Sequence, residues 1–139
     1  MRMSTKGRYG TRAMLDIALN YEKGPVSLRE LAQRQELSVK YLEQLIQPLK
    51  EAGLVESIRG AGGGYTLSRL PSEINLLQIV QALENLSPVD CLDTPESCPR
   101  VSKCATYDVW KELQDSTYNI LASLTLMDMM ERQRQKSEL

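Results

Sequence analysis

Hydrophobic residues recur at three- and four-residue spacing near the start of the chain, a pattern that predicts an amphipathic helix. The stripe consists of Tyr9, Ala13, Met14, Ile17, Ala18 and Tyr21. We expect this helix to end at Gly24, because the following Pro25 does not continue a helix.

The next two predicted helices lie close together in the sequence. Ser27 and Glu30 have the spacing of a capping box, which predicts a short helix over residues 27–35. A second serine cap, Ser38, begins a helix that ends at Gly53 and buries a stripe of Leu42, Leu45, Ile46 and Leu49. Two helices separated by a tight turn have the spacing of a helix-turn-helix.

A glycine-rich turn follows the third helix. Residues 54–59 and 65–69 are expected to form two short strands, and the turn between them, residues 60–64, contains four glycines. A β-hairpin directly after a helix-turn-helix is a wing. The first half of the chain therefore predicts a winged helix-turn-helix.

The second half of the chain predicts three more helices. Asn75 and Gln78 have capping-box spacing at the start of a short apolar helix, and Thr125 and Asp128 have it at the start of a last helix. Between them, a long helix begins near Ala105 and carries a repeating stripe of Val109, Leu113, Thr117, Ile120 and Leu124. A long amphipathic helix at the end of a small domain is most simply buried against a second copy of itself.

We therefore expect a mainly α-helical fold with a small β-hairpin, consisting of a winged helix-turn-helix and a long C-terminal dimerisation helix. The expected divisions are a DNA-binding domain over residues 1–85, a cysteine-rich loop over 86–104, and a dimerisation helix with a C-terminal tail over 105–139. The 139 residues leave no room for a second full domain.

Composition narrows the function classes. The sequence has no apolar run of about 18 residues and no secretory leader, so we expect a cytoplasmic protein without a membrane partner. It has no histidine, no nucleophile motif and no phosphate-binding loop followed by a lysine. We therefore expect no enzymatic activity and no small-molecule substrate.

Charge is distributed unevenly between the two halves. Residues 1–70 hold eleven Lys/Arg against seven Asp/Glu, a balance of +4, and the remaining residues have a balance of −5. A basic first half that contains a helix-turn-helix predicts double-stranded DNA as the partner.

Specific residues are candidates for each kind of DNA contact. Base and nearby phosphate contacts are expected at the start of the recognition helix, from Ser38, Lys40, Tyr41, Glu43 and Gln44. Gln44 suits an adenine edge, and the Glu43 carboxylate is tolerated near DNA where it accepts from a cytosine amino group. The alternative for Glu43 is a solvent-facing helix residue. The wing would contribute Arg59, Gly60 and Gly63, and Lys6, Arg8 and Arg29 would contact phosphates.

All three cysteines, Cys91, Cys98 and Cys104, lie within one polar, proline-containing stretch of fourteen residues. Thiolates bind soft metals and iron-sulfur clusters, and a short loop lowers the entropy cost of gathering them. The residues alone leave three alternatives open: a metal or cluster site, a structural zinc site, and a metal-free thiol redox switch.

Three blocks together resemble the IscR-type winged-helix transcription regulators, an iron-sulfur cluster regulator family. These are MRMSTKGRYGTRAMLDIAL, the block from SVKYLEQL to RGAGGGY, and the cysteine cluster ahead of a long helix that contains Trp110. The resemblance implies a homodimeric DNA-binding regulator in which Cys91, Cys98 and Cys104 hold an iron-sulfur cluster, 2Fe-2S rather than 4Fe-4S.

The chain departs from this family at the fourth cluster ligand. Where the family has a histidine, three positions after the last cysteine, this sequence has Tyr107. Some relatives use a carboxylate from the partner's first helix, at a position that corresponds here to Arg8. The candidate oxygen ligands are therefore Tyr107 and Asp108, followed by Asp90, Asp93 and Glu96.

Overall fold

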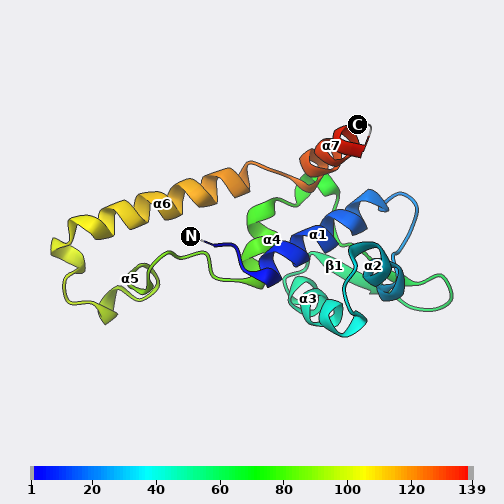
Figure 1. Cartoon of the computed structure of the whole chain (residues 1–139), viewed down its shortest axis with the longest axis horizontal. Helices are drawn as coiled ribbons and strands as arrows, with labels where there is room; N and C mark the ends of the chain where they lie inside the picture. Colours follow the sequence, from blue (N-terminus) through cyan, green and yellow to red (C-terminus); the bar gives the residue numbers. More distant parts are fainter. Residues whose placement is uncertain (1, 138–139) are drawn as a thin grey trace.

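The computed structural model describes residues 2–137 and divides into a helical head and a projecting arm (Figure 1). The head contains α1 (Thr5–Leu19), α2 (Leu28–Gln35), α3 (Val39–Glu51), β1 (Val55–Ile58), β2 (Gly64–Leu67), η1 (Pro71–Glu73) and α4 (Leu76–Leu83). The rest comprises α5 (Asp90–Asp93), η2 (Pro95–Ser97), η3 (Val101–Lys103), α6 (Ala105–Ala122) and α7 (Leu126–Ser137). The terminal residues Met1, Glu138 and Leu139 of the predicted domains lie outside the described residues.

The expected fold class is confirmed, because the helices and a two-stranded antiparallel hairpin form a winged helix-turn-helix followed by a long helix. Some details differ from expectation: α3 ends at Glu51 rather than Gly53, and the two strands, predicted over 54–59 and 65–69, are shorter. The first helix ends at Leu19, five residues before Gly24, since the backbone N–H of Asn20 donates to the carbonyl oxygens of Ala18 and Ile17 rather than continuing the helical pattern. The segment predicted as a plain cysteine loop contains three short helical turns.

Side-chain caps begin most helices of the head. The hydroxyls of Ser27 and Ser38 accept from the backbone N–H three residues on, at 3.1 and 3.0 Å. Asn75 and Gln78 form the expected reciprocal capping box. The box predicted at Ser27 is only half formed, because the carboxylate of Glu30 lies 3.6 Å from the guanidinium of Arg34 instead.

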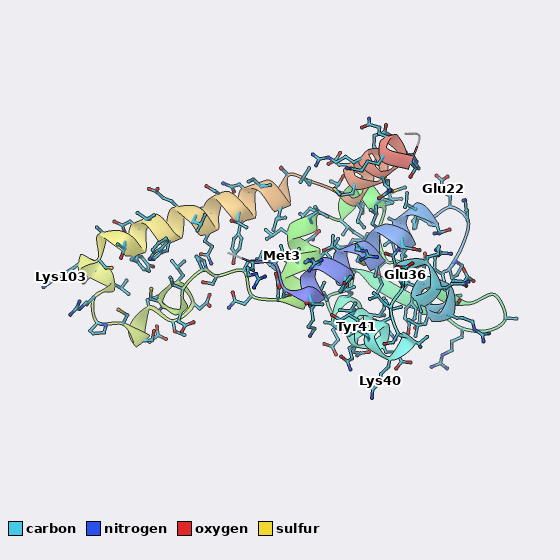
Figure 2. The ribbon with its side chains drawn as sticks, in the orientation of Figure 1. Met3, Glu22, Glu36, Lys40, Tyr41 and Lys103 are labelled. Carbon is cyan, nitrogen blue, oxygen red and sulfur yellow. The ribbon has the colours of Figure 1, made fainter. Side chains whose placement is uncertain are left out.

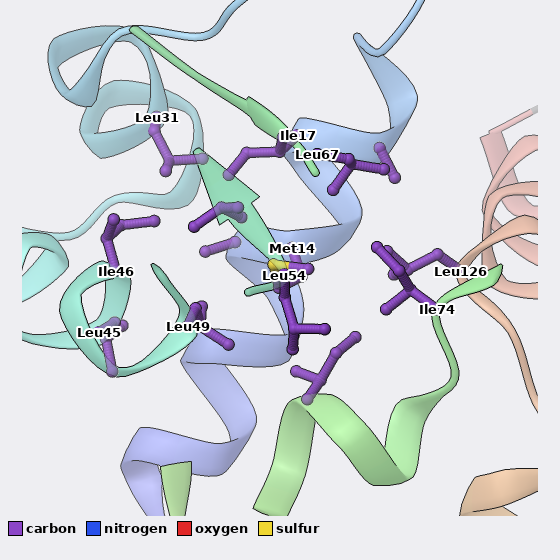
Figure 3. Packing of buried hydrophobic residues seen from close by; sticks show 14 of the residues in the cluster. Met14, Ile17, Leu31, Leu45, Ile46, Leu49, Leu54, Leu67, Ile74 and Leu126 are labelled. Atoms are coloured by element: carbon purple, nitrogen blue, oxygen red, sulfur yellow. The ribbon is translucent and has the colours of Figure 1, made fainter. Parts of the chain in front are cut away.

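The core lies between α1 and the elements that surround it. Met14, Leu42, Leu49 and Leu54 are fully buried, and Leu126 reaches the same cluster from α7 (Figure 3). Burial of such side chains stabilises the fold by about 1.5–3 kcal/mol each. The head is thus held together by one core that includes the last helix.

The wing is tied to the rest of the head by a further backbone pairing. Val55 pairs with Leu67 and Ile58 with Gly64 in the hairpin. Val26, in the segment between α1 and α2, exchanges two backbone hydrogen bonds with Tyr65, at 2.9 and 2.7 Å. A Cβ on Gly64 would lie 2.4 Å from the carbonyl oxygen of Val26, so this close approach requires glycine.

The arm, residues 85–122, consists of the cysteine-containing segment and α6. Figure 1 shows the α5 segment leaving the head and α6 running beside it back towards the head. None of the side chains of α6 is buried, whereas α7 returns to pack on α1 and η1. The division of the chain at residues 85 and 104 stays a prediction, but α7 shares the core of the head.

Candidate nucleic-acid interface and cysteine loop

The first turn of α3 presents a polar surface to solvent. Ser38, Lys40, Glu43 and Gln44 are exposed, while Tyr41 is half-buried. The Ser38 cap holds the Tyr41 amide and so fixes where this turn begins. Figure 2 shows Lys40 pointing away from the head, with Tyr41 on the adjacent position.

The start of α1 lies beside this turn. Lys6 lines one shallow hollow together with Lys40, Glu43, Gln44, Gln47 and Pro48. The structure therefore brings together four residues that the sequence predicted as separate DNA contacts, and it adds Gln47. The position of Gln47, one helical turn after Glu43, was the sequence signal that would have identified it.

The other predicted DNA contacts lie outside this hollow. Arg59 and Gly60 are exposed at the end of β1, and Arg29 is exposed on α2. A Cβ on Gly63 would lie 2.2 Å from the carbonyl oxygen of Ile58, which makes the wing turn too tight for any other residue without a backbone shift. Arg59 is thus carried on a short, glycine-dependent turn.

Tyr9 joins α1 to α3. Its ring meets the ring of Tyr41 edge-on, with 6.3 Å between centroids and an interplanar angle of 86°. The guanidinium carbons of Arg8 and Arg12 lie over the Tyr9 ring at 5.5 and 5.0 Å. The sequence pattern assigned Tyr9 only to the apolar stripe. The arginines one residue before it and three residues after it were the sequence signal for the cation–π contacts of its ring.

A buried carboxylate connects α1 with α2. Asp16 is 5% exposed and accepts from Arg34 Nε and Nη2 and from Gln35 Nε2, at 2.7 to 3.2 Å. The hydrogen bond to Asp16 raises the pKa of Arg34. Arg12 completes the network by donating to the side-chain and backbone oxygens of Gln35, both at 3.1 Å. Sequence reasoning missed this network, because its members come from two different helices.

The three cysteines are free thiols and are all half-buried. Cys104 lies at the N-terminus of α6, where its Sγ is 3.1 Å from Thr106 Oγ1. The Thr106 hydroxyl, helped by nearby backbone N–H groups, lowers the pKa of the Cys104 thiol. The surroundings of Cys104 therefore favour the thiolate, the form that binds metals.

The donor chemistry of the loop fits an iron-sulfur cluster, but its arrangement is not that of a preformed site. Over residues 2–137, no three Cys, Asp or Glu side chains are grouped so as to hold a metal ion. Of the oxygen candidates, Asp93 is engaged by Asn85 Nδ2 at 2.8 Å, while Asp108 is exposed and Tyr107 half-buried. Gathering the three thiols would require the loop to rearrange.

The arm is linked to the start of α1 where it leaves the head. Glu84, directly after α4, accepts a hydrogen bond from the Ser4 backbone amide at 2.9 Å. A Cβ on Gly7 would lie 2.9 Å from the Glu84 carboxyl carbon, so the glycine allows this carboxylate to approach. Lys6 and Arg8 follow directly on α1. The residue that leads into the cysteine loop thus contacts the basic start of α1.

Hydropathy gives no indication of a membrane segment, since none of the helices in the described part of the chain is both long and apolar enough to span a bilayer.

Comparisons with known proteins agree with these features. The profile of the Rrf2 family, described as an iron-dependent transcriptional regulator, matches residues 3–132. Protein rrf2 of Nitratidesulfovibrio vulgaris is 44% identical over 131 residues, which cover 94% of this chain and 87% of that protein. The structure of T. potens IscR has a TM-score of 0.79 and 42% identity, with 95% and 88% of the two chains covered. CymR, the global cysteine regulator of B. subtilis, has a TM-score of 0.79 and 41% identity, with 95% and 98% covered.

Proposed function

The chain belongs to the Rrf2 family of transcriptional regulators, and from this premise we propose that it is a cytoplasmic homodimer whose affinity for operator DNA depends on the state of its cysteine loop. The resemblance to IscR-type regulators is confirmed by these relatives, which are named as regulators and not as enzymes. One observation carries the proposal. The polar first turn of α3 lies beside Lys6 of α1, and the residue that caps α1, Ser4, is hydrogen-bonded to Glu84, which leads into the cysteine loop.

DNA recognition is assigned to the first turn of α3. Gln44 would pair with an adenine edge, and Glu43 would accept from a cytosine amino group. Val39, which is 42% exposed at the start of the helix, would contact a thymine methyl group. Ser38, Lys40 and Tyr41 would complete contacts to bases and phosphates.

Phosphate and wing contacts would position this turn on the duplex. Lys6, Arg8 and Arg29 supply the positive charge that phosphates attract, and their contribution would be independent of sequence. Arg59 with Gly60 and Gly63 would approach the adjacent minor groove, where a glycine turn allows close backbone contact.

Dimerisation is assigned to α6. Val109, Leu113 and Ile120 are 52%, 41% and 61% exposed, and they repeat at helical spacing along one stripe. Large apolar side chains in a row on a projecting helix favour association with another copy. A two-fold dimer would present two recognition helices to successive half-sites.

Sensing is assigned to Cys91, Cys98 and Cys104, which would hold an iron-sulfur cluster. When bound, such a cluster supplies one-electron redox chemistry and iron that reacts with oxygen or nitric oxide. We assign 2Fe-2S by resemblance to the family, with Tyr107 or Asp108 as the fourth ligand. Thr106 and backbone N–H groups lower the pKa of the Cys104 thiol and so favour the thiolate that would ligate iron.

Coupling between loop and head would pass through Glu84. Rearrangement of the loop to gather three thiols would pull on the segment that begins at Asn85, next to the Glu84 carboxylate that holds the Ser4 amide. A shift of Ser4 would move the helix that carries Lys6 and Arg8. Loop ordering of this kind is a known means of biasing a two-state interface.

The test combines cluster analysis with DNA binding. Anaerobically purified wild type, Cys98→Ala and the neighbouring control Ser97→Ala would be compared by visible absorbance, iron content and acid-labile sulfide. Iron and sulfide in wild type and control, but not in Cys98→Ala, are expected. Duplexes selected from a randomised library by the wild type would then be bound with and without the cluster, and a changed affinity is expected.

Other outcomes would replace the sensing assignment. Colourless protein whose DNA affinity changes on oxidation would indicate the metal-free thiol switch. Bound zinc without visible absorbance would indicate a structural zinc site. Wild type that selects no duplex from the library would refute DNA recognition itself.

A further inference from the structure

The side chain of Tyr9 touches the recognition helix without lying on it. Tyr9 is half-buried in the first half of α1, and its ring meets that of Tyr41 edge-on at 6.3 Å and 86°. Tyr41 lies in the first turn of α3, between Lys40 and the exposed pair Glu43 and Gln44. An edge-to-face contact has a preferred geometry, so it restrains the orientation of both rings.

Two arginines hold the Tyr9 ring in place. The guanidinium carbons of Arg8 and Arg12 lie 5.5 and 5.0 Å from its centroid, within the range of cation–π attraction. Arg12 is itself fixed, because it donates to both the side-chain and backbone oxygens of Gln35 at 3.1 Å. Gln35 ends α2, three residues before the Ser38 cap of α3.

We propose that Tyr9 is a positioning residue for base recognition, which orients the first turn of α3 through Tyr41 and is held by Arg8 and Arg12. This inference rests on the proposed DNA-binding function. Since discrimination between bases needs side chains placed within hydrogen-bond distance of the base edges, loss of the Tyr9 ring would weaken discrimination more than total charge-driven affinity.

The variants separate the ring from the hydroxyl. Tyr9→Phe keeps both ring contacts, whereas Tyr9→Leu keeps apolar volume but removes the edge-to-face and cation–π contacts. Tyr21→Leu is the matched control, because Tyr21 is also half-buried and packs on the core, but lines the groove between α1, η1 and α7 on another part of the head.

Two quantities are measured. The first is the affinity for a duplex selected by the wild type divided by the affinity for single-base-pair variants of that duplex. The second is the salt dependence of binding to an unselected duplex. Tyr9→Leu is expected to lose about tenfold in this ratio, with the salt slope unchanged because no charge is removed. Tyr9→Phe and Tyr21→Leu are expected to retain the wild-type ratio.

Equal losses of affinity on selected and unselected duplex, or an unchanged ratio in Tyr9→Leu, would overturn the inference while leaving the proposed function intact. Absence of duplex binding by the wild type would overturn both. If Tyr9→Leu does not fold, Arg12→Lys is measured instead, because position 12 is exposed and tolerates replacement. Lysine keeps the charge but lacks the planar guanidinium that reaches both Gln35 oxygens. A wild-type ratio in Arg12→Lys would then refute the positioning role.

Discussion

Arg34 on α2 donates two hydrogen bonds to the buried carboxylate of Asp16 on α1, from Nη2 to Oδ1 at 2.7 Å and from Nε to Oδ2 at 3.0 Å. The carboxylate is 5% exposed and the arginine 42% exposed. A forked guanidinium matches the two oxygens of a carboxylate, which makes the pair a directional link between the two helices.

Removal of this arginine is expected to destabilise the head. Arg34→Met would leave the Asp16 carboxylate buried with fewer donors and would lower the free energy of unfolding by about 2–3 kcal/mol. Urea denaturation measures this. Arg29→Met on the same helix is the control, because Arg29 is exposed and forms no ion pair within residues 2–137; its effect should stay within about 0.5 kcal/mol. Equal effects at both positions would contradict the structural role of the pair.

The wing depends on Gly64 more than on its neighbour Gly62. A Cβ at Gly64 meets the backbone oxygen of Val26 at 2.4 Å, whereas a Cβ at Gly62 meets nothing within 4 Å. Gly62→Ala should cost about 1–2 kcal/mol for its positive φ alone, and Gly64→Ala about 1–3 kcal/mol more for the backbone displacement. Thermal unfolding of the two variants gives the comparison, and similar melting temperatures would show that the Val26 pairing is dispensable.

Charge at the two ends of α3 is expected to matter unequally for DNA binding. Lys40 lines the hollow at the start of the helix, while Lys50 is exposed in its last turn. Lys40→Ala should weaken binding to every duplex and reduce the slope of log Kd against log salt by about 1, as expected for one lost phosphate contact. Lys50→Ala should leave the slope unchanged. Fluorescence anisotropy over a salt series measures both, and an unaltered slope in Lys40→Ala would remove that contact from the interface.

Self-association is expected to depend on the stripe of α6. Leu113 is 41% exposed, and burial against a partner would stabilise association by about 1.5–3 kcal/mol per such residue. Leu113→Glu places a charge in that contact and should shift the protein towards monomer. Asn119→Glu makes the same charge change at an exposed position beside the stripe and should not. Sedimentation equilibrium would decide, and a wild type that is monomeric throughout would reject α6 as the dimer contact.

The cap of α7 is expected to make stability depend on pH. The backbone amide of Thr125, together with its hydroxyl, lowers the pKa of Asp128 from 3.8. Because the pKa is lower in the folded state, the ionised cap stabilises the fold fully above the unfolded value and loses this contribution as pH falls through the folded value. The stability difference between wild type and Asp128→Asn should therefore be present at pH 6 and shrink below about pH 4.

The matched control for this cap is Asp115→Asn. Asp115 is exposed on α6, where its partner is the side chain of Lys111 rather than a helix-capping amide. Its replacement should change stability little at either pH, since exposed pairs contribute about 0–1 kcal/mol. Urea denaturation at pH 6 and pH 3 measures the free energy of unfolding of both variants and the wild type. If Asp128→Asn differs from the wild type by the same amount at both pH values, the ionised cap is excluded.

Local patterns were sufficient to predict the six longer helices and the hairpin, but not the short turns η1, α5, η2 and η3. The Ser38 cap, the Asn75 and Gln78 capping box, and the Thr125 and Asp128 pair all formed as expected, because each involves residues three positions apart. The glycine turn formed the wing for the same reason. The capping box at Ser27 formed only in half, because the Glu30 carboxylate lies 3.6 Å from the guanidinium of Arg34, a second partner one helical turn further on.

The sequence by itself determined the helix caps, the wing, the polar first turn of α3 and the confinement of the cysteines to one segment, since these follow from neighbouring residues. Only the tertiary structure decided that Tyr9 meets Tyr41, that Asp16 is buried against Arg34, and that Glu84 holds Ser4 across 80 positions of sequence. It also placed α7 in the core of the head while leaving α6 exposed. The physical reason is that periodicity shows which face of a helix is apolar, but the partner that buries that face is chosen by the packing of the whole chain.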